Sequence, residues 1–363
     1  MRGGRILYVD TGKAFGGAER VTLSLAGAFS ASGADVLCVV DPGAASFRNS
    51  LLDAGVRVSA VAEASSRSLA APLEEEVRRF RPDWVHIHRT WPLSDRHAAA
   101  AAKRGGAGRI IATEHVRSEG CGLRDRLAKR LLVRHDDRIV AVSDAVRRSL
   151  IRYWRVPAKR ITVIPNGIDT ARFRGALPLE PDPFPPGTTH RIGSIGRLER
   201  QKGFDVLLEA MTRIRAALPG AVLVIAGEGS RRADLEERAA GLGLGGAALF
   251  PGAIPDAAPF LARLDLFVLP SRWEGLPLTI LEAMAAGTPI AATAVDGTAE
   301  AARDGREASL VPPEDPERLA AACVDALRDR AGALRRAEAA RIRVEERHSL
   351  AGMVDRYREA YGW

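Results

Sequence analysis

Residues 266–293, LFVLPSRWEGLPLTILEAMAAGTPIAAT, decide the fold of this chain. The apolar run 266–269 is short and is followed by turn residues, as in a buried parallel strand. Pro277 suits the start of a helix over 278–286, which a Gly-Thr-Pro sequence ends. A second apolar run follows at 289–293. A strand, a helix and a strand in this order are the repeating unit of a doubly wound parallel sheet.

The same alternation extends in both directions along the chain. In the N-terminal half, buried strands are expected at 5–10, 36–40, 83–88, 109–113, 138–142 and 161–164. Helix-period segments such as 18–32 and 123–133 separate them. In the C-terminal half, strands are expected at 191–196, 221–227, 247–250, 266–269 and 289–293, and helices at 203–218, 231–241, 278–286 and 316–329. We therefore predict an α/β chain with two Rossmann-like, doubly wound parallel-sheet domains.

A proline-rich segment separates the two halves. Residues 176–187, ALPLEPDPFPPG, contain five prolines and almost no periodicity, which is typical of a linker. We expect an N-terminal domain over 1–175 and a linker over 176–189. A C-terminal domain would extend over 190–340, and one helical segment over 341–363 would cross back to the N-terminal domain. The active site is expected in the cleft between the domains.

The composition excludes several classes of protein. With 363 residues, 46% hydrophobic and 27% charged, the chain fits two ordinary globular domains. Cys38, Cys121 and Cys323 are widely separated and form no CxxC pair, so neither a disulfide framework nor a zinc site is supported.

Charge and hydropathy bear on partners and location. The net charge of +8 suits an anionic partner surface, or simply helices solvated by arginine, and both interpretations stay open. No nucleic-acid-binding motif accompanies this charge. The N-terminal apolar run has the length of a strand rather than of a signal peptide, and no stretch approaches the roughly 18 apolar residues of a membrane span. We expect a cytoplasmic protein with at most a peripheral membrane contact.

One helical segment could make that contact. Residues 122–138, GLRDRLAKRLLVRHDDR, place leucines at helical spacing with Arg and Lys between them. Such a helix can lie on an anionic membrane. It can also pack its leucines on the sheet and expose a basic face to water. The composition favours packing on the sheet.

Two glutamates flank the start of the helix predicted over 278–286. Glu274 lies in the loop ahead of the helix, and Glu282 lies inside it. The amides at the positive end of a helix favour phosphate. Because two acids would repel a phosphate, they need other partners, and the paired hydroxyls of sugar rings would suit them. The alternative is that Glu274 caps the helix and Glu282 faces solvent.

This segment resembles the signature of the family 4 retaining glycosyltransferases (glycosyl transferases group 1), which have the GT-B fold. Members of that family carry two glutamates eight positions apart, as Glu274 and Glu282 are here. The resemblance implies that Glu274 contacts hydroxyls of the transferred sugar and that Glu282 binds the ribose. It also implies that the amides of Gly275 and Leu276 bind the phosphate.

A second motif would supply positive charge. Gly-Arg-Leu at 196–198 and Gln-Lys-Gly at 201–203 resemble the GRL…KG motif of the family. Both follow a strand and precede a helix. Arg197 and Lys202 would there neutralise the departing diphosphate, which is the largest charge change in the reaction.

Three further segments fall in the order expected for the family. Residues 225–229, IAGEG, which include Glu228, resemble the strand and loop beside the nucleotide pocket. Residues 250–254, FPGAI, resemble the segment whose backbone holds the base, with Ile254 at its end. Residues 295–300, VDGTAE, resemble the VGGxxE stretch, although Asp296 replaces its first glycine.

The N-terminal half offers glycines and histidines. Gly16 and Gly17 open a helix, where the backbone could approach the donor phosphate or an acceptor, or form only a tight turn. His115 follows strand 109–113 and matches a family histidine near the donor sugar, which implies that it orients hydroxyls rather than acting as a general base. His88 ends another strand, where it lines the acceptor side or is a hydrogen-bonded structural histidine.

The sequence thus predicts a retaining glycosyltransferase that needs no cofactor beyond its co-substrate, a nucleoside diphosphate sugar. UDP-sugars are favoured and GDP-sugars are possible. The acceptor would be a hydroxyl of a glycan, a lipid-linked molecule or a small molecule. The expected catalytic residues are Glu274, His115, Arg197 and Lys202, and no side chains have the spacing of metal ligands. A GT-B nucleotide-sugar epimerase and a non-catalytic sugar-nucleotide-binding protein are the alternatives.

Overall fold

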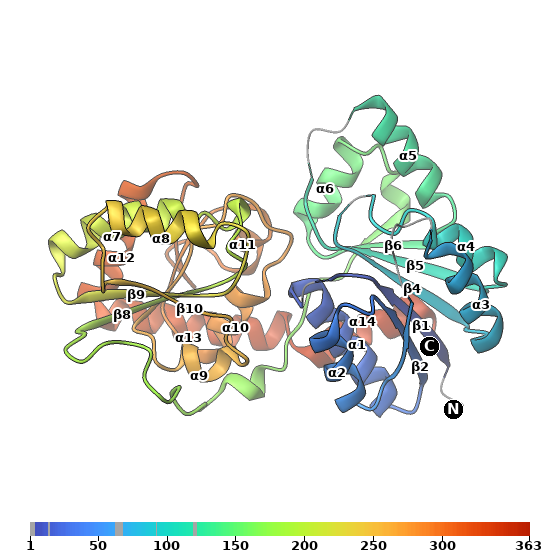
Figure 1. Cartoon of the computed structure of the whole chain (residues 1–363), viewed down its shortest axis with the longest axis horizontal. Helices are drawn as coiled ribbons and strands as arrows, with labels where there is room; N and C mark the ends of the chain where they lie inside the picture. Colours follow the sequence, from blue (N-terminus) through green and yellow to red (C-terminus); the bar gives the residue numbers. More distant parts are fainter. Residues whose placement is uncertain (1–3, 14, 62–67, 92, 119–121) are drawn as a thin grey trace. The chain divides into compact units, whose positions relative to one another are not determined.

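The computed structural model describes residues 4–13, 15–61, 68–91, 93–118 and 122–363. The chain forms two compact units. Unit 1 comprises Met1–Asn166 and Leu350–Trp363, and unit 2 comprises Gly167–Ser349. Each unit has its own parallel sheet with helices on both faces (Figure 1).

The described part of unit 1 contains a seven-stranded parallel sheet in the order β3-β2-β1-β4-β5-β6-β7. The strands are β1 Arg5–Asp10, β2 Asp35–Val40, β3 Arg57–Ala60, β4 Trp84–Arg89, β5 Arg109–Glu114, β6 Arg138–Ala141 and β7 Ile161–Val163. The helices are α1 Gly17–Ala31, α2 Ala45–Asp53, α3 Ala70–Phe80, α4 Ala98–Arg104, α5 Leu123–Val133, α6 Asp144–Arg152 and α14 Leu350–Tyr361. The strand order reverses between β1 and β4, which is where ligands bind in open α/β sheets.

The described part of unit 2 repeats this design with six parallel strands in the order β10-β9-β8-β11-β12-β13. The strands are β8 His190–Ile195, β9 Ala221–Ala226, β10 Ala248–Gly252, β11 Leu266–Leu269, β12 Ile290–Thr293 and β13 Ser309–Val311. The helices are α7 Phe204–Ala217, α8 Arg232–Gly241, α9 Ala257–Leu261, α10 Leu278–Ala286, α11 Asp296–Ala301, α12 Pro316–Arg328 and α13 Arg330–Arg347. The described residues also form three 3-10 turns: η1 Ala158–Arg160 in unit 1, and η2 Thr170–Phe173 and η3 Arg200–Lys202 in unit 2.

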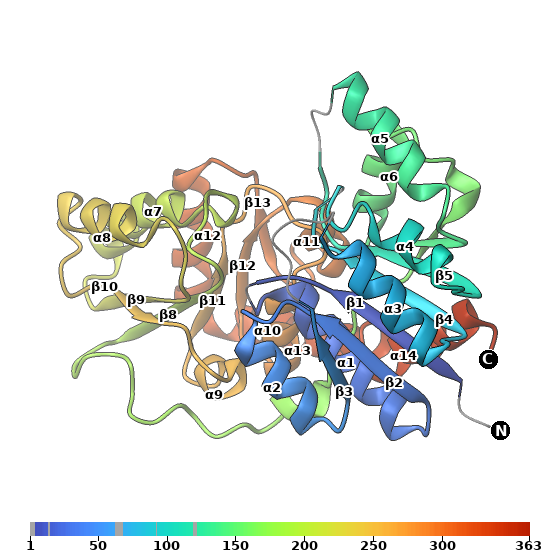
Figure 2. The same ribbon diagram turned by 45° about the vertical axis from the view of Figure 1, so that its right-hand side comes forward.

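Helices cover both faces of each sheet. In unit 1, α1 packs with α2 and α14 on one face, and α3 packs with α4 on the other (Figures 1 and 2). In unit 2, α7 packs with α8 and α12, while α10 packs with α9 and α13. All six residues of β9, AVLVIA, are therefore buried, because a strand covered on both faces is apolar along its length. The predicted fold class, two Rossmann-like parallel-sheet halves, is confirmed.

The chain passes from unit 1 to unit 2 between Asn166 and Gly167, ahead of the proline-rich segment. Turn η2 contacts α9 and α10, which places residues 170–173 in unit 2. The proline-rich segment also belongs to unit 2: the Leu179 amide donates to the carbonyl of Pro259 at 2.8 Å, and Nε of Arg263 donates to the carbonyl of Leu179 at 2.9 Å.

The expectation of one uninterrupted helical segment at 341–363 was wrong. Helix α13 ends at Arg347, His348 leaves the helical conformation with φ −131°, and α14 begins at Leu350. The carbonyl of His348 instead accepts a hydrogen bond from the Ile168 amide at 2.9 Å. The chain returns to unit 1 at this break.

The expectation that the leucines of α5 pack on the sheet was also wrong for three of the four leucines. Leu123, Leu127 and Leu131 are 72%, 52% and 58% exposed. The buried face of α5 is offset from this leucine stripe and contains Lys129, Leu132 and Val133. Among the described helices, none is long and apolar enough to cross a membrane.

Candidate active site

The loops after β8 and β11 meet at the carboxyl edge of the unit 2 sheet. Gly203, at the end of the β8 loop, has φ +65°, and a Cβ there would lie 2.1 Å from the carbonyl oxygen of Pro270. Only glycine allows the two loops to approach this closely. The approach lets Lys202 reach Glu274: Nζ lies 2.6 Å from Oε1, with the side chains 13% and 5% exposed.

Glu274 is held in place from several sides. The Ser271 hydroxyl donates to Oε1 at 2.7 Å, and Nε2 of Gln201 lies 3.4 Å from Oε2. Glu274 does not cap α10, whose N-cap residue is Pro277 and which has no side-chain cap. Lys202 and Ser271 fix one carboxylate oxygen, whereas Oε2 makes only the long contact with Gln201 among the described residues. Oε2 is therefore available to accept a hydrogen bond from a hydroxyl.

The start of α10 is tightly packed. A Cβ at Gly297 would lie 1.9 Å from the carbonyl oxygen of Gly275, so α11 approaches the loop ahead of α10 closely. Leu276 is 5% exposed. Glu282, one turn inside α10, is also 5% exposed, so the interpretation in which it faces solvent was wrong. With no side chain capping the helix, its positive end suits an anion.

Arg197 is linked to Glu274 through Gln201. Arg197 is exposed, and its Nη2 lies 3.3 Å from Oε1 of Gln201. The amide nitrogen of the same Gln201 donates to the carbonyl of Trp273 at 3.0 Å and faces Glu274. Gln201 was not predicted as a site residue. Its place one residue ahead of Lys202 in the Gln-Lys-Gly motif was the available signal.

Asp296 is a second residue whose role the sequence analysis missed. Its φ is +40°, in the left-handed region that glycine adopts without strain. The family pattern has glycine here, and Asp tolerates this conformation better than most residues. Oδ2 of Asp296 accepts the backbone N–H of Glu274 at 3.0 Å. This side chain therefore helps to fix the loop that carries Glu274.

Glu228 and Ile254 lie in the loops after β9 and β10, at the same carboxyl edge of the sheet. Oε1 of Glu228 is 2.7 Å from Nη1 of Arg232, whose Nη2 donates to the carbonyl of Phe250 at 2.6 Å. Ile254 is half-buried. Apart from Glu282, which lies inside α10, the predicted donor-side residues of unit 2 thus lie on the loops that follow four neighbouring strands.

In unit 1, Gly16 and Gly17 begin α1 after β1. The carboxylate of Glu19 accepts the Gly16 amide at 2.9 Å and already uses part of the positive end of the helix. A Cβ at Gly17 would meet nothing within 4 Å, so the space beside it is open. Burial, followed by repulsion from Glu19, raises the pKa of nearby Asp10 to about 8. Two carboxyl groups, those of Asp10 and Glu19, thus lie near the glycine loop.

His88 and His115 meet at the carboxyl ends of β4 and β5. Nδ1 of His88 lies 2.9 Å from Nε2 of His115, and the side chains are 1% and 8% exposed. Burial lowers the pKa of His115 to about 3 and that of His88 well below its usual value. His88 is too buried to contact an acceptor directly. Its contact with His115 agrees with the interpretation as a hydrogen-bonded structural histidine, although its Nε2 has no hydrogen-bond partner among the described residues.

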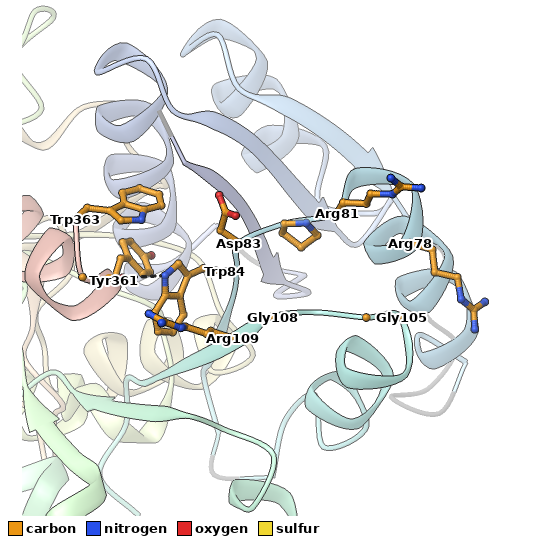
Figure 3. A pocket seen from close by; sticks show the side chains of 12 residues that line it. Arg78, Arg81, Asp83, Trp84, Gly105, Gly108, Arg109, Tyr361 and Trp363 are labelled. Carbon is orange, nitrogen blue, oxygen red and sulfur yellow. Dashed lines mark hydrogen bonds between the residues drawn. The ribbon is translucent and has the colours of Figure 1, made fainter. Parts of the chain in front are cut away.

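A pocket of about 940 Å³ lies elsewhere in unit 1, at the amino ends of β4 and β5 (Figure 3). Arg78 and Arg81 lie on one side, and Arg109 lies on the other, 5.4 Å from the ring of Trp84. The guanidinium groups do not converge, so the pocket lacks a built anion site. Among the described residues, no group of three or more His, Cys, Asp or Glu side chains could hold a metal ion. Cys38 and Cys323 are buried, and Cys121 lies outside the described residues.

Two parallel-sheet units of this kind, with loop-borne polar residues at the carboxyl edges, define a GT-B architecture. Residues 15–172 match the family model described as Glycosyltransferase Family 4, and residues 189–329 match the model described as Glycosyl transferases group 1. The chain therefore belongs to the family 4 glycosyltransferases. The resemblance found in the sequence is confirmed.

Individual relatives point the same way. The chain is 34% identical over 278 residues to a glycogen synthase of Mycobacterium tuberculosis, covering 74% of this chain and 65% of that relative. It is 29% identical over 345 residues to the lipopolysaccharide core biosynthesis glycosyltransferase LpsE of Rhizobium meliloti, covering 94% of each. The crystal structure of Anabaena HepE in complex with UDP-glucose superposes with a TM-score of 0.85 at 19% identity over 99% of both chains, which shows the shared fold.

Proposed function

We propose that this chain is a retaining, metal-independent glycosyltransferase that uses a nucleoside diphosphate sugar. The observation that carries the proposal is the ion pair between Lys202 and Glu274 beside the start of α10. Lys202 supplies a cation that suits a diphosphate, and Glu274 supplies a carboxylate that suits sugar hydroxyls. Buried charges need partners, and Lys202 and Glu274 are partners of each other. Each would also be complementary to one part of a nucleoside diphosphate sugar.

In this proposal, Lys202 and Glu274 bind different parts of the donor. Lys202, Arg197 and the positive end of α10 hold the diphosphate, and Oε2 of Glu274 accepts a hydroxyl of the transferred sugar. Glu282 binds the ribose, the amides of Gly275 and Leu276 bind phosphate, and the loops with Glu228 and Ile254 border the base. Gly16 and Gly17 supply further amides. His115 orients the sugar without taking a proton, which suits a group with a lowered pKa.

The reaction is a substitution on one face of the sugar. The bond between C1 and the β-phosphate oxygen breaks, and the acceptor hydroxyl oxygen bonds to C1 from the same face. The acceptor proton passes to the departing phosphate oxygen, so no side chain has to remove it. The positive groups around the diphosphate stabilise the charge that develops in the transition state.

A UDP-sugar is the favoured donor and a GDP-sugar the alternative. HepE was crystallised with UDP-glucose, whereas a relative from Mycolicibacterium smegmatis that is 29% identical over 248 residues is named as GDP-mannose-dependent. The acceptor is a hydroxyl of a glycan, a lipid-linked molecule or a small molecule, and a cytoplasmic location would give access to all three.

The donor can be identified by thermal stability. A ligand that binds only the folded protein raises its stability by about 2.7 kcal/mol at a hundredfold excess over Kd. We expect a UDP-sugar to raise the melting temperature in the presence of a chelator, and Lys202→Gln to reduce that shift. No shift with any nucleoside diphosphate or its sugar would contradict donor binding.

Product analysis then separates the alternatives. NMR of the product should show the anomeric configuration of the donor. Incubation with donor alone should leave its sugar configuration unchanged, whereas an epimerase would change it. Donor binding with neither transfer nor hydrolysis across a panel of acceptors would support a binding protein instead.

We also propose that α5 contacts an anionic membrane. On a helical projection, Arg130 and Arg134 lie on the same face as Leu123 and Leu127, and all four side chains are exposed. Asp125 lies on another face. An apolar stripe within a basic face is the arrangement that lies flat on anionic lipid.

Vesicles test this contact directly. We expect the protein to sediment with phosphatidylglycerol vesicles and not with phosphatidylcholine vesicles. The triple variant Leu123→Ser, Leu127→Ser and Leu131→Ser should lose the binding. Leu177→Ser is the matched control, because Leu177 is 82% exposed but lies in unit 2. Equal sedimentation of the triple variant would contradict the proposal.

A further inference from the structure

The contact between His88 and His115 restricts which ring nitrogens of the two histidines can carry a proton. The rings are stacked, with centroids 5.1 Å apart and planes at 22°, and Nδ1 of His88 faces Nε2 of His115 at 2.9 Å. A hydrogen bond between two ring nitrogens requires that one of them carry a proton and the other not. Because burial lowers the pKa of both groups, both rings are neutral and each carries a single N–H.

Two proton arrangements satisfy this bond. In the first, Nδ1–H of His88 donates, so Nε2 of His88 is a bare acceptor and His115 carries its proton on Nδ1. In the second, Nε2–H of His115 donates, so His88 carries its proton on Nε2 and Nδ1 of His115 is a bare acceptor. The two arrangements present opposite hydrogen-bonding groups on His115.

The buried Nε2 of His88 decides between them. It has no hydrogen-bond partner among the described residues. A buried N–H without an acceptor loses its hydrogen bonds to water and gains none in the protein. Such unpaired donors are rarer in proteins than acceptors that lack a donor. The second arrangement would create an orphaned donor at this atom, and the first would leave only an acceptor there. The first arrangement is therefore the more stable one.

We propose that His88 is a positioning residue that holds His115 in the Nδ1–H tautomer, so that His115 offers a hydrogen-bond donor to its ligand. No described residue hydrogen-bonds Nδ1 of His115, and this atom is not among the buried unpartnered ones. The matching ligand group is an oxygen that accepts, such as a sugar hydroxyl or ring oxygen. The part that this donor plays in transfer rests on the proposed function, whereas the tautomer itself does not.

A third histidine holds the pair in orientation. The ring of His86 lies 4.3 Å from that of His88. Both nitrogens of His86 are engaged, Nδ1 by the hydroxyl of Tyr361 at 2.7 Å and Nε2 by that of Thr113 at 2.8 Å. Tyr357 bonds Thr113 at 2.9 Å. His88 is thus stacked between a fixed ring and His115, and α14 supplies the tyrosines that fix it.

The tautomer can be measured without any substrate. In the full chain labelled with ¹⁵N-histidine, the ring nitrogens of His115 can be assigned among the seven histidines by loss of its signals in His115→Asn. At neutral pH we expect a protonated Nδ1 and an unprotonated Nε2. A protonated Nε2 on His115 in the wild-type protein would overturn the proposal whether or not the chain transfers sugar.

A pair of nearly isosteric variants tests the effect on transfer. In His88→Asn the side-chain amide can still donate to Nε2 of His115, whereas His88→Leu cannot. Loss of a group that orients a histidine from the outer shell costs roughly 10–100-fold in activity. We expect His88→Leu to lower kcat by that factor with donor KM changed less than about twofold, and His88→Asn to stay within about threefold of wild type.

Melting temperatures of both variants separate positioning from folding. Equal losses of kcat in the Asn and Leu variants would overturn the positioning role. If neither the wild type nor the variants transfer any sugar, the proposed function fails, and the NMR result still decides the tautomer.

Discussion

The carboxyl edges of the two sheets carry different kinds of chemistry. In unit 2 the edge is charged, with Lys202 paired to Glu274 at 2.6 Å and the exposed Arg197 linked to the pair through Gln201. In unit 1, buried and uncharged histidines lie at the carboxyl ends of β4 and β5. A diphosphate needs positive charge, whereas sugar hydroxyls need donors and acceptors at fixed places. This difference agrees with the proposed function, in which Lys202 and Arg197 bind the diphosphate and His115 orients a neutral group of the sugar.

Unit 1 also contains buried charged side chains, but these pair with one another inside the protein. Arg89, at the end of β4, is completely buried and makes two hydrogen bonds to Asp136 at 2.8 and 2.9 Å. It also bonds Glu114 at 3.2 Å, and the ammonium group of Lys129 on α5 bonds the same carboxylate oxygen. Two cations and two anions balance without a ligand. This cluster ties α5 to the sheet, so we expect it to affect stability and not catalysis.

The largest effect should follow from breaking this buried cluster. Arg89→Met leaves Asp136 and Glu114 buried with less compensating charge, and breaking a buried pair in this way costs about 3–5 kcal/mol. Urea unfolding should show this loss. Arg232→Met is the matched control: Arg232 pairs with Glu228 at the surface, where solvent screens the pair and its loss should cost much less. If the two variants lost equal amounts of unfolding free energy, the buried cluster would contribute no more to stability than a surface ion pair does.

The next effect concerns activity in unit 2. Glu274→Ala, or Arg197→Ala combined with Lys202→Ala, should leave the fold intact and lower kcat for transfer by roughly 10²–10³-fold, the usual cost of losing an oxyanion-type contact. Glu236→Ala is a suitable control because Glu236 pairs with Arg232 on the exposed face of α8. Near-wild-type turnover in the first two variants would contradict the site assignment.

The same contrast explains how much could be predicted from the sequence. The buried strands were found because a parallel sheet covered on both faces requires continuous apolar runs, as in β9. The edge strand β3, RVSA, is half-exposed and lacks such a run, and β13 has only three residues. Neither was predicted.

The candidate site shows a similar division. Glu274 and Lys202 stand in contiguous motifs, so their types and spacing are visible in the chain. The contact between His88 and His115 joins residues 27 positions apart and depends on the register of β4 with β5, which no local pattern encodes. The buried face of α5 was predicted wrongly from its leucines, because the burial of Lys129 depends on Glu114, a partner from another element. The only sign of a special role for Asp296 in the sequence was that it replaces a glycine of the family pattern.

At pH 4, the smallest of these effects is expected at Asp10, because Asn keeps the shape of the side chain. Burial, then repulsion from Glu19, raises the pKa of Asp10 to about 8, so the folded protein holds a proton that the unfolded chain releases near pH 4. The stability that this proton contributes is complete below about pH 4 and is lost as the pH rises to about 8. Neutral Asn has no such loss and can donate to the Thr22 hydroxyl, which lies 3.2 Å from the carbonyl of Ala18 as its own acceptor. Urea unfolding should therefore show wild type and Asp10→Asn nearly equal at pH 4, and the variant progressively more stable up to pH 8. A constant difference across this range would show that Asp10 is ionised in the folded protein, and unit 1 would then have a charged edge like that of unit 2.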